Sequence, residues 1–476
     1  MPHEGEELDG FRIGARLHVG GMAVLWEATH PDHDFPIVIK VPRLAEGEDP
    51  AAIVSFEMEQ MILPRISGPH VPRFVAASGF DTRPYLAMER IPGTSLLPLI
   101  GELPLPFDQV AAIGALVADA LEALHRQHVV HLDVKPSNIL TRQSGEAVLI
   151  DFGLSHHAQL PDLMEEEFRL PYGTAPYMAP EQVMGVRCDP RSDLFALGAM
   201  LYFFTTGVRP HGDPQRLAGL KRRLWRDPQP PRRLRPDCPD WLQEIILRCL
   251  EVQPEQRHPT AAQLAFDLRN PNDVVLTARA RKERQDGWAR TIQRRFHPDH
   301  QPRFTHRRDS EEAAASAPIV VVAVDLTATD PALHAALRAT VRQILGTLPG
   351  GRLACINVLR QNRIALDTTL DEQGKNKHLQ RLVELKHWAA PLALPQGRVS
   401  FHVLAAINPA SAILEHARVN GVDHIVMGAR AQSLRRRMLG SVSAEVAADA
   451  PCSVTVVRPR AAAAPSSQQS DSLQEA

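Results

Sequence analysis

Two aspartates in short polar loops constrain this chain more than any other feature. Residues 131–138 read HLDVKPSN, and an Asp-Phe-Gly triplet begins at residue 151, thirteen positions after Asn138. Phosphoryl transfer from ATP needs a carboxylate that orients the attacking hydroxyl, an amine for the transferred phosphate, and an amide and a carboxylate that hold magnesium. The residues that supply these groups are Asp133, Lys135, Asn138 and Asp151.

The two segments resemble the catalytic loop and the metal-binding loop of eukaryotic-type Ser/Thr protein kinases of bacteria. The resemblance implies a bilobal α+β fold that transfers the γ-phosphate of ATP to protein hydroxyls. Asp133 would be the base, and Lys135 would stabilise charge on the transferred phosphate. Asn138 and Asp151 would hold Mg²⁺. A lysine two positions after the aspartate is the pattern of Ser/Thr rather than Tyr kinases.

A nucleotide site is expected upstream of these loops. Residues 17–25, LHVGGMAVL, resemble the glycine-rich loop that covers ATP phosphates, although His18 and Ala23 stand where the family has glycine. Lys40 ends IVIK, similar to the family's V-A-I-K, and would pair with Glu59, with Glu57 as the second choice. The residues that the resemblance places around the nucleotide are Leu17, Gly20, Gly21, Leu25, Val38, Lys40, Met88, Glu89, Ile91, Leu140 and Asp151.

The expected adenine pocket departs from the family at one position. Val38 replaces the usual small alanine, which narrows the pocket by two methyl groups. Met88 would be the gatekeeper, and the backbone of Glu89 and Ile91 would receive adenine. Leu140 would form the floor of the pocket.

The segment after the metal-binding loop predicts activity without phosphorylation. Leu132 stands directly before the catalytic aspartate, where the family usually has an arginine that pairs with a phosphorylated residue. Between residues 154 and 171, Ser155 carries the only hydroxyl. The acidic run at residues 165–167 is either a permanent negative charge or a solvated run.

Residues 173–181, GTAPYMAPE, resemble the substrate-docking end of this segment. The resemblance implies that Thr174 bridges Asp133 and Lys135 and that Glu181 forms a structural ion pair with Arg257. In the same way, Asp193 would hydrogen-bond the catalytic-loop backbone, and His131 would be a packed scaffold residue.

Composition excludes several other classes of protein. The chain has 476 residues, and its 53 Lys+Arg nearly balance 55 Asp+Glu, so net charge does not favour nucleic acid or membrane partners. Five scattered cysteines without a CxxC motif indicate a reduced, cytoplasmic setting. The polar start MPHEGEELDG is no signal peptide, and no apolar run of 18 or more residues predicts a membrane span.

Composition also divides the chain. We expect a kinase domain at residues 8–270, a basic linker at 271–316, a second domain at 317–458 and a disordered tail at 459–476. The linker is either solvated, with room for one helix, or a binding patch for acidic partners. Within 317–458, five short apolar runs alternate with four helical segments, which predicts a parallel α/β sheet of five strands.

This second pattern resembles the universal stress protein family, which has a flavodoxin-like fold. Gly428 and Gly440-Ser441 match its nucleotide loop, but Ala431 replaces the second glycine and the spacer that follows is one residue short. ATP binding by this domain therefore stays open. Asp325 matches the acidic position that meets the nucleotide, or caps its strand. The last strand, SVTVVR, resembles the edge through which family members dimerise.

Three interpretations follow. The first is an active Ser/Thr protein kinase with a C-terminal module that regulates it or senses stress. The second is a pseudokinase-like scaffold that binds nucleotide without transferring phosphate. The altered glycine-rich loop and Val38 favour this interpretation. The third, a small-molecule kinase, is disfavoured by the docking segment at 173–181.

Overall fold

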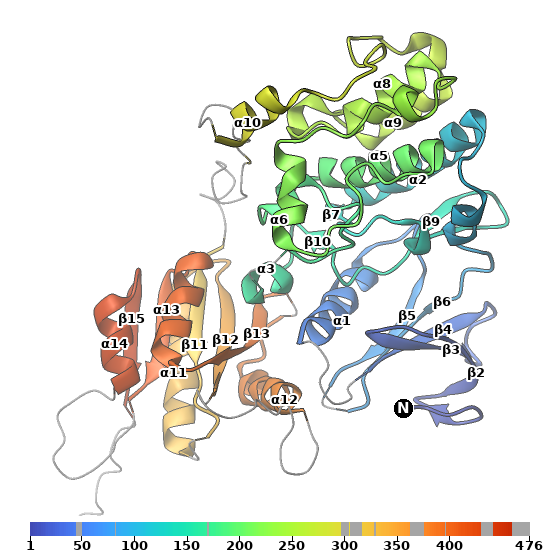
Figure 1. Ribbon diagram of the computed structural model, residues 1–476. Coiled ribbons are helices and arrows are strands. Elements are labelled where there is room, and N and C mark those ends of the chain that lie inside the picture. Colours follow the sequence, from blue (N-terminus) through green and yellow to red (C-terminus); the bar gives the residue numbers. More distant parts are fainter. Residues whose placement is uncertain are drawn as a thin grey trace, which may run out of the picture. The chain divides into compact units, whose positions relative to one another are not determined.

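The computed structural model describes residues 1–43, 50–80, 82–168, 171–296, 304, 317–327, 330–361, 376–395, 397–429 and 441–458. They form two compact units, and the main boundary between the units lies between residues 316 and 317 (Figure 1). Within these described ranges, no helix combines the length and the apolar composition needed to cross a bilayer.

The first unit begins with a six-stranded antiparallel sheet in the order β1-β2-β3-β4-β6-β5. Its strands are β1 (Glu7–Leu8), β2 (Phe11–Val19), β3 (Ala23–Thr29), β4 (Ile37–Pro42), β5 (Phe74–Ser78) and β6 (Tyr85–Glu89). Alternate residues such as Ile13, Trp26 and Ile39 point into one buried cluster. Helix α1 (Pro50–Ile62) contacts β4, and its Met58 and Ile62 are fully buried.

The larger lobe of this unit is built on four helices. They are α2 (Phe107–His125), α5 (Arg191–Thr206), α8 (Asp240–Cys249) and α9 (Ala261–Arg269). Helix α5 is buried on nearly every side, which explains its almost wholly apolar sequence. It packs closely on α8: a Cβ added at Gly198 would lie 2.3 Å from the Cβ of Cys249, so only glycine fits there.

Short elements complete the first unit. They are η1 (Leu63–Arg65), η2 (Leu97–Glu102), β7 (Val129–Val130), η3 (Pro136–Asn138), β8 (Ile139–Thr141), β9 (Ala147–Leu149), β10 (His156–His157), α3 (Leu163–Glu167), α4 (Pro180–Val183), α6 (Leu217–Leu220), η4 (Lys221–Leu224), α7 (Pro231–Leu234), η5 (Pro254–Gln256), η6 (Pro271–Asp273) and α10 (Trp288–Phe296). β7 pairs with β10 and β8 with β9, both antiparallel.

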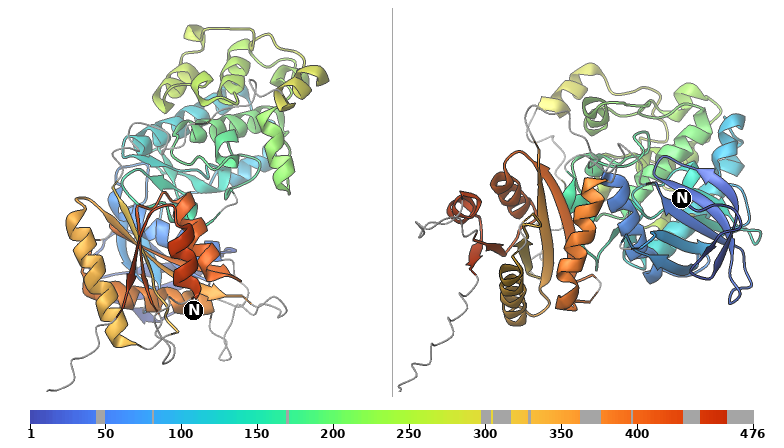
Figure 2. Two further views of the ribbon diagram at one scale, coloured as in Figure 1. Left: turned by 90° about the vertical axis from the view of Figure 1, so that its left-hand side faces the viewer. Right: turned by 90° about the horizontal axis from the view of Figure 1, so that it is seen from below.

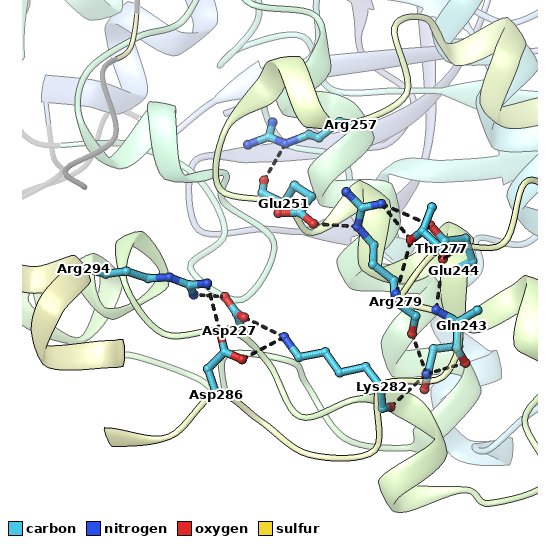
Figure 3. Close-up of polar contacts among 11 residues, drawn as sticks. Asp227, Gln243, Glu244, Glu251, Arg257, Thr277, Arg279, Lys282, Asp286 and Arg294 are labelled. Atoms are coloured by element: carbon cyan, nitrogen blue, oxygen red, sulfur yellow. Dashed lines mark hydrogen bonds and ion pairs between the residues drawn. The ribbon is translucent and has the colours of Figure 1, made fainter. Parts of the chain in front are cut away.

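The prediction of a solvated linker from residue 271 is wrong for its first part. Residues 277–296, here called the strap, bind the large lobe through ion pairs and hydrogen bonds (Figure 3). Three of the basic residues that suggested a linker, Arg279, Lys282 and Arg294, have acidic partners on the lobe, such as Asp227 and Glu244. Residues 271–276 of the expected linker are described too, whereas the linker residues after 296, except residue 304, lie outside the described ranges.

The second unit is a five-stranded parallel sheet in the order β13-β12-β11-β14-β15, as the alternating pattern predicted. Its strands are β11 (Ile319–Ala323), β12 (Arg352–Arg360), β13 (Val399–Ala406), β14 (His424–Gly428) and β15 (Ser453–Val457). Its helices are α11 (Pro331–Thr347), α12 (Lys377–Ala389), α13 (Pro409–Val419) and α14 (Ser441–Asp449), and a short η10 (Ala390–Leu392) follows α12.

Helices cover both faces of this sheet (Figure 2). The apolar side chains of α13 and α14 share one buried cluster with alternate strand residues such as Val321 and Ile356. The intervening strand residues, such as Val320 and Cys355, are equally buried on the other face. Of the expected nucleotide loop, Gly428 ends β14, whereas Ala431, the spacer and Gly440 lie outside the described residues. Asp325 accepts hydrogen bonds from Thr327 at the end of the first strand.

Candidate functional site

The catalytic loop holds Asp133 in a closed set of hydrogen bonds. The Thr174 hydroxyl donates to Oδ1 of Asp133 at 2.7 Å, and the Lys135 amine donates to Oδ2 at 2.6 Å. Lys135 also donates to the Thr174 hydroxyl at 3.0 Å, so the expected bridge between the three residues is present. The side-chain amide of Asn138 donates to the carboxylate and to the backbone carbonyl of Asp133, both at 3.1 Å.

Helix α5 fixes the backbone of this loop through the side chain of Asp193. The fully buried carboxylate of Asp193 accepts the backbone N–H groups of His131 and Leu132, each at 2.8 Å, and pairs with His125 at 2.8 Å. Leu132 has the left-handed φ of 64°, a strained conformation that these contacts maintain. His131 is buried against the ring of Phe152, in the predicted scaffold position.

Lys40 lies between two carboxylates from opposite lobes. Its amine is 2.5 Å from Glu59 in α1 and 2.9 Å from Asp151, so the expected partner is Glu59 and not Glu57. Burial alone would lower the pKa of Lys40, but Asp151 and Glu59 together raise it above its usual value. The charge of Lys40 in turn lowers the pKa of Asp151, so both groups are ionised at neutral pH.

The metal-binding loop is ordered around the same pair. Asp151 has a φ of 70°, and the backbone N–H of Phe152 donates to Glu59 at 3.3 Å. A Cβ added at Gly153 would lie 2.0 Å from the hydroxyl oxygen of Ser55, so glycine allows α1 to approach this loop. Helix α1 therefore positions both Lys40 and Asp151.

One face of the small-lobe sheet brings together four of the expected nucleotide-binding residues. Leu25 in β3 pairs with Lys40 in β4, and Val38 in β4 pairs with Met88 in β6. Directly opposed residues point to the same face, and Val38 and Lys40 are two positions apart, so all four side chains share it. Val38 and Met88 are buried, which makes this face an apolar surface next to the Lys40 amine.

The residues expected at the hinge lie at the end of β6. The side chain of Glu89 is held by Arg142 through contacts of 2.5 and 2.9 Å, an ion pair that the sequence analysis missed. Ile91 is buried, and Leu140 in β8 bridges to Ser95 in the following segment. These contacts fix the backbone of residues 89–95.

The glycine-rich loop is the β2–β3 hairpin. The Gly20 N–H donates to the carbonyl of Ala23 at 2.9 Å, and Arg43 donates to the carbonyl of Gly20 at 3.1 Å. Leu17, like other apolar residues of this hairpin, is exposed. A Cβ added at Gly21 would meet no atom within 4 Å. His18 pairs with Leu25, so its side chain lies on the face that carries Lys40.

These residues fit ATP and Mg²⁺. Magnesium is usually held by one or two protein oxygen ligands together with substrate phosphates. Asp151 and Asn138 offer such ligands, and the side chain of Asp151 is 45% exposed. In the described ranges, no group of three or more His, Cys, Asp or Glu could hold a metal ion by itself.

Two buried side chains anchor the segment after the metal-binding loop. Ser155, its one hydroxyl, is fully buried and donates to the carbonyl of His131 at 3.1 Å. Buried Asp162 lies 2.7 Å from Arg187 and 3.1 Å from His156. Burial alone would raise the pKa of Asp162, but Arg187 and His156 hold it well below its usual range. This anchor was not predicted, because nothing in the sequence indicates which residues meet Asp162.

The docking segment is held at both ends. Glu181 forms the expected ion pair with Arg257 through contacts of 2.6 and 2.8 Å, with both side chains almost fully buried. Nearer to Thr174, the buried Arg223 of η4 donates to the carbonyl of Ala175 at 2.7 Å and to that of Met178. Arg223 was not predicted from the sequence, since its partners are backbone atoms.

Two family models match this chain. Residues 11–267 match the model of the protein kinase domain, and residues 318–458 match that of the universal stress protein family. Among solved structures, the kinase domain of Mycobacterium tuberculosis PknI is 23% identical, covers 57% of this chain and 99% of that chain, and has a TM-score of 0.45.

Two relatives illustrate the similarity. The serine/threonine-protein kinase Pkn1 of Myxococcus xanthus is 34% identical over 60% of this chain and 42% of its own length. A probable serine/threonine-protein kinase of Clostridium perfringens is 28% identical over 56% of this chain and 39% of its own length. The chain thus spans about two fifths of these relatives. Because the kinase model matches more than half of the chain, the chain belongs to the protein kinase family and carries a universal stress protein domain after it.

Proposed function

We propose that this protein transfers the γ-phosphate of ATP to serine or threonine hydroxyls of other proteins, with Mg²⁺ as the metal. The observation that carries the proposal is the bridge of Thr174 between Asp133 and Lys135. It holds the carboxylate that orients an incoming hydroxyl beside the amine that neutralises the transferred phosphate. The ion pairs of Lys40 with Glu59 and Asp151 support nucleotide binding in the same place.

The chemistry assigned to the chain is mainly positioning. Asp133 would accept a hydrogen bond from the substrate hydroxyl and take its proton, and Lys40 would contact the α/β-phosphates. Bound Mg²⁺ would neutralise charge on the β- and γ-phosphates, with Asn138 and Asp151 as its ligands. The apolar face formed by Leu25, Val38 and Met88 would take the adenine.

The test is phosphate transfer from labelled ATP with Mg²⁺ to the protein itself and to myelin basic protein. We expect label with the wild type and none with Asp133→Asn or Asp151→Ala. Nucleotide binding without any transfer by a folded wild type would contradict the proposal and favour the scaffold alternative.

We further propose that the C-terminal domain regulates the kinase, that it can form a homodimer through β15, and that the protein acts in the cytoplasm. The order of the two domains supports regulation, and β15 lies at an edge of its sheet. Deleting residues 317–476 should change the activity, the response to ATP or the oligomeric state measured by light scattering. If none of these changes, the regulatory proposal is wrong.

A further inference from the structure

The strap is bound to the large lobe at two separate places (Figure 3). At α8, the buried carboxylate of Glu244 accepts the backbone N–H groups of Thr277 and Ala280, each at 3.0 Å. Gln243 donates to three strap carbonyls, those of residues 279, 280 and 282. This first anchor fixes the path of the strap backbone.

The second anchor is Asp227, which follows η4. Its carboxylate lies 2.9 Å from the amine of Lys282 and 2.7 Å from the guanidinium of Arg294. Asp286 binds the same two cations, at 3.5 and 2.9 Å. Four charges from the strap and the lobe therefore form one network, which is stronger than an isolated surface ion pair.

The short segment before Asp227 also reaches the docking segment. Arg223 lies four residues before Asp227 and is 1% exposed, and its guanidinium donates to the carbonyls of Ala175 and Met178. In the described part of the chain, no carboxylate pairs with this arginine. Its hydrogen bonds therefore depend on where η4 lies.

Between these two residues, Trp225 gives the strap a further contact with the same segment. The guanidinium of Arg295 lies 5.2 Å from the centre of the Trp225 ring. Residues 223–227 are thus held by the docking segment on one side and by the strap on the other.

We propose that the strap and Arg223 form a positioning relay for protein substrates, which rests on the kinase activity proposed above. The strap fixes residues 223–227 through Asp227, and Arg223 holds the carbonyls that follow Thr174. Because Thr174 binds Asp133, the relay ends at the docking surface beside the catalytic aspartate. Arg223 is a positioning residue, since it acts through the backbone of the docking segment.

The experiment uses the full chain with Asp227→Asn and Arg294→Met as test variants. Arg284→Met is the matched control, because Arg284 is an exposed strap residue that no carboxylate of the described ranges pairs with. We expect the KM for myelin basic protein to rise about fivefold or more in the test variants. The KM for ATP should stay unchanged, and the control should behave as wild type. A purely structural strap would leave the KM for the protein substrate unchanged, and that result would overturn the relay.

A second readout does not depend on activity. Amide hydrogen exchange of residues 173–181 should become faster in Asp227→Asn and stay unchanged in Arg284→Met. Faster exchange confined to the strap would overturn the relay even if the wild type transfers no phosphate. If the wild type is inactive but exchange at 173–181 responds as expected, the proposed activity is wrong and the mechanical link through Arg223 stands.

Discussion

The catalytic loop and the glycine-rich loop would meet the same nucleotide, yet they are built in opposite ways. Asp133 and Asn138 are buried and bound to several other residues, and Asp193 fixes the backbone beneath them. The hairpin of residues 17–25 exposes Leu17, Val19 and Met22. Residues 23–25 pair with β4, and Arg43 binds the tip of the hairpin through Gly20 and Met22. The catalytic loop is therefore held by contacts within the protein, whereas we expect a bound nucleotide to add contacts to the hairpin.

The largest loss of stability should come from breaking the buried Glu181–Arg257 ion pair, which anchors the docking segment next to the catalytic loop. Glu181→Gln leaves the buried Arg257 without its partner, so the unfolding free energy of the kinase unit should fall by about 3–5 kcal/mol. Urea unfolding followed by fluorescence measures it. The double variant Glu181→Leu with Arg257→Met should recover part of the loss. If Glu181→Gln were as stable as wild type, this ion pair would not stabilise the kinase unit.

A second variant acts on the catalytic loop itself. Thr174→Ala removes the hydroxyl that holds Asp133 and Lys135 together, so kcat should fall by about 100-fold because the carboxylate is no longer fixed. Thr174→Ser keeps the hydroxyl and should retain most of the activity. Steady-state kinetics at saturating ATP measures both, and equal rates in the two variants would remove the bridge from the mechanism.

A third pair of variants asks whether phosphate is needed on the activation segment. Ser155→Ala should keep kcat within about twofold of wild type, because Ser155 is buried and bound to the backbone. Asp162→Asn should lower both kcat and stability, because Arg187 and His156 lose their shared carboxylate. Loss of transfer in a folded Ser155→Ala variant would contradict phosphorylation-independent activity.

The contribution of Asp162 has a defined pH dependence. Its pKa is lower in the folded than in the unfolded protein, so its stabilisation is complete above the unfolded pKa near 4. It is lost as pH falls through the lower folded value. The stability difference between wild type and Asp162→Asn should thus be constant from pH 5 to 7 and shrink below about pH 4. A difference that shrinks already between pH 7 and 5 would point to another group.

A small change in nucleotide binding is expected at the glycine-rich loop. His18→Gly restores the family residue where the histidine side chain lies on the face that carries Lys40. The KM for ATP should fall by about two- to threefold, because removing the imidazole lets the backbone approach the phosphates closely, as glycine does. Kinetics at varied ATP measures this, and kcat should change little. A rise in the KM would show that His18 helps to bind the nucleotide.

Much of the site could be predicted because its chemistry fixes residue types at short spacings. Asp133, Lys135 and Asn138 lie within six positions, and the Lys40–Glu59 pair follows from one strand and the next helix. The five-stranded sheet could be predicted for a similar reason, since each apolar run is bounded by a helical segment.

The contacts that were not predicted join residues that are far apart in the sequence, and no nearby pattern indicates which residues they meet. Arg294 meets Asp227 from 67 positions away, and Arg223 meets backbone carbonyls 45 and 48 positions away. A basic stretch is predicted to be solvated when its acidic partners are distant in sequence. An arginine that binds backbone carbonyls cannot be matched to a partner, because any residue type can supply a carbonyl. Only the folded backbone brings these groups together.

The strap also bears on the order in which this chain can fold during synthesis. The ribosome releases the N-terminal part first. Glu244 in α8 is buried, but its backbone donors are residues 277 and 280, beyond residue 267 where the family model ends. When the ribosome has released only the residues that the family model matches, the Glu244 carboxylate still lacks these two hydrogen-bond donors. The large lobe can therefore close fully only after the strap has left the exit tunnel.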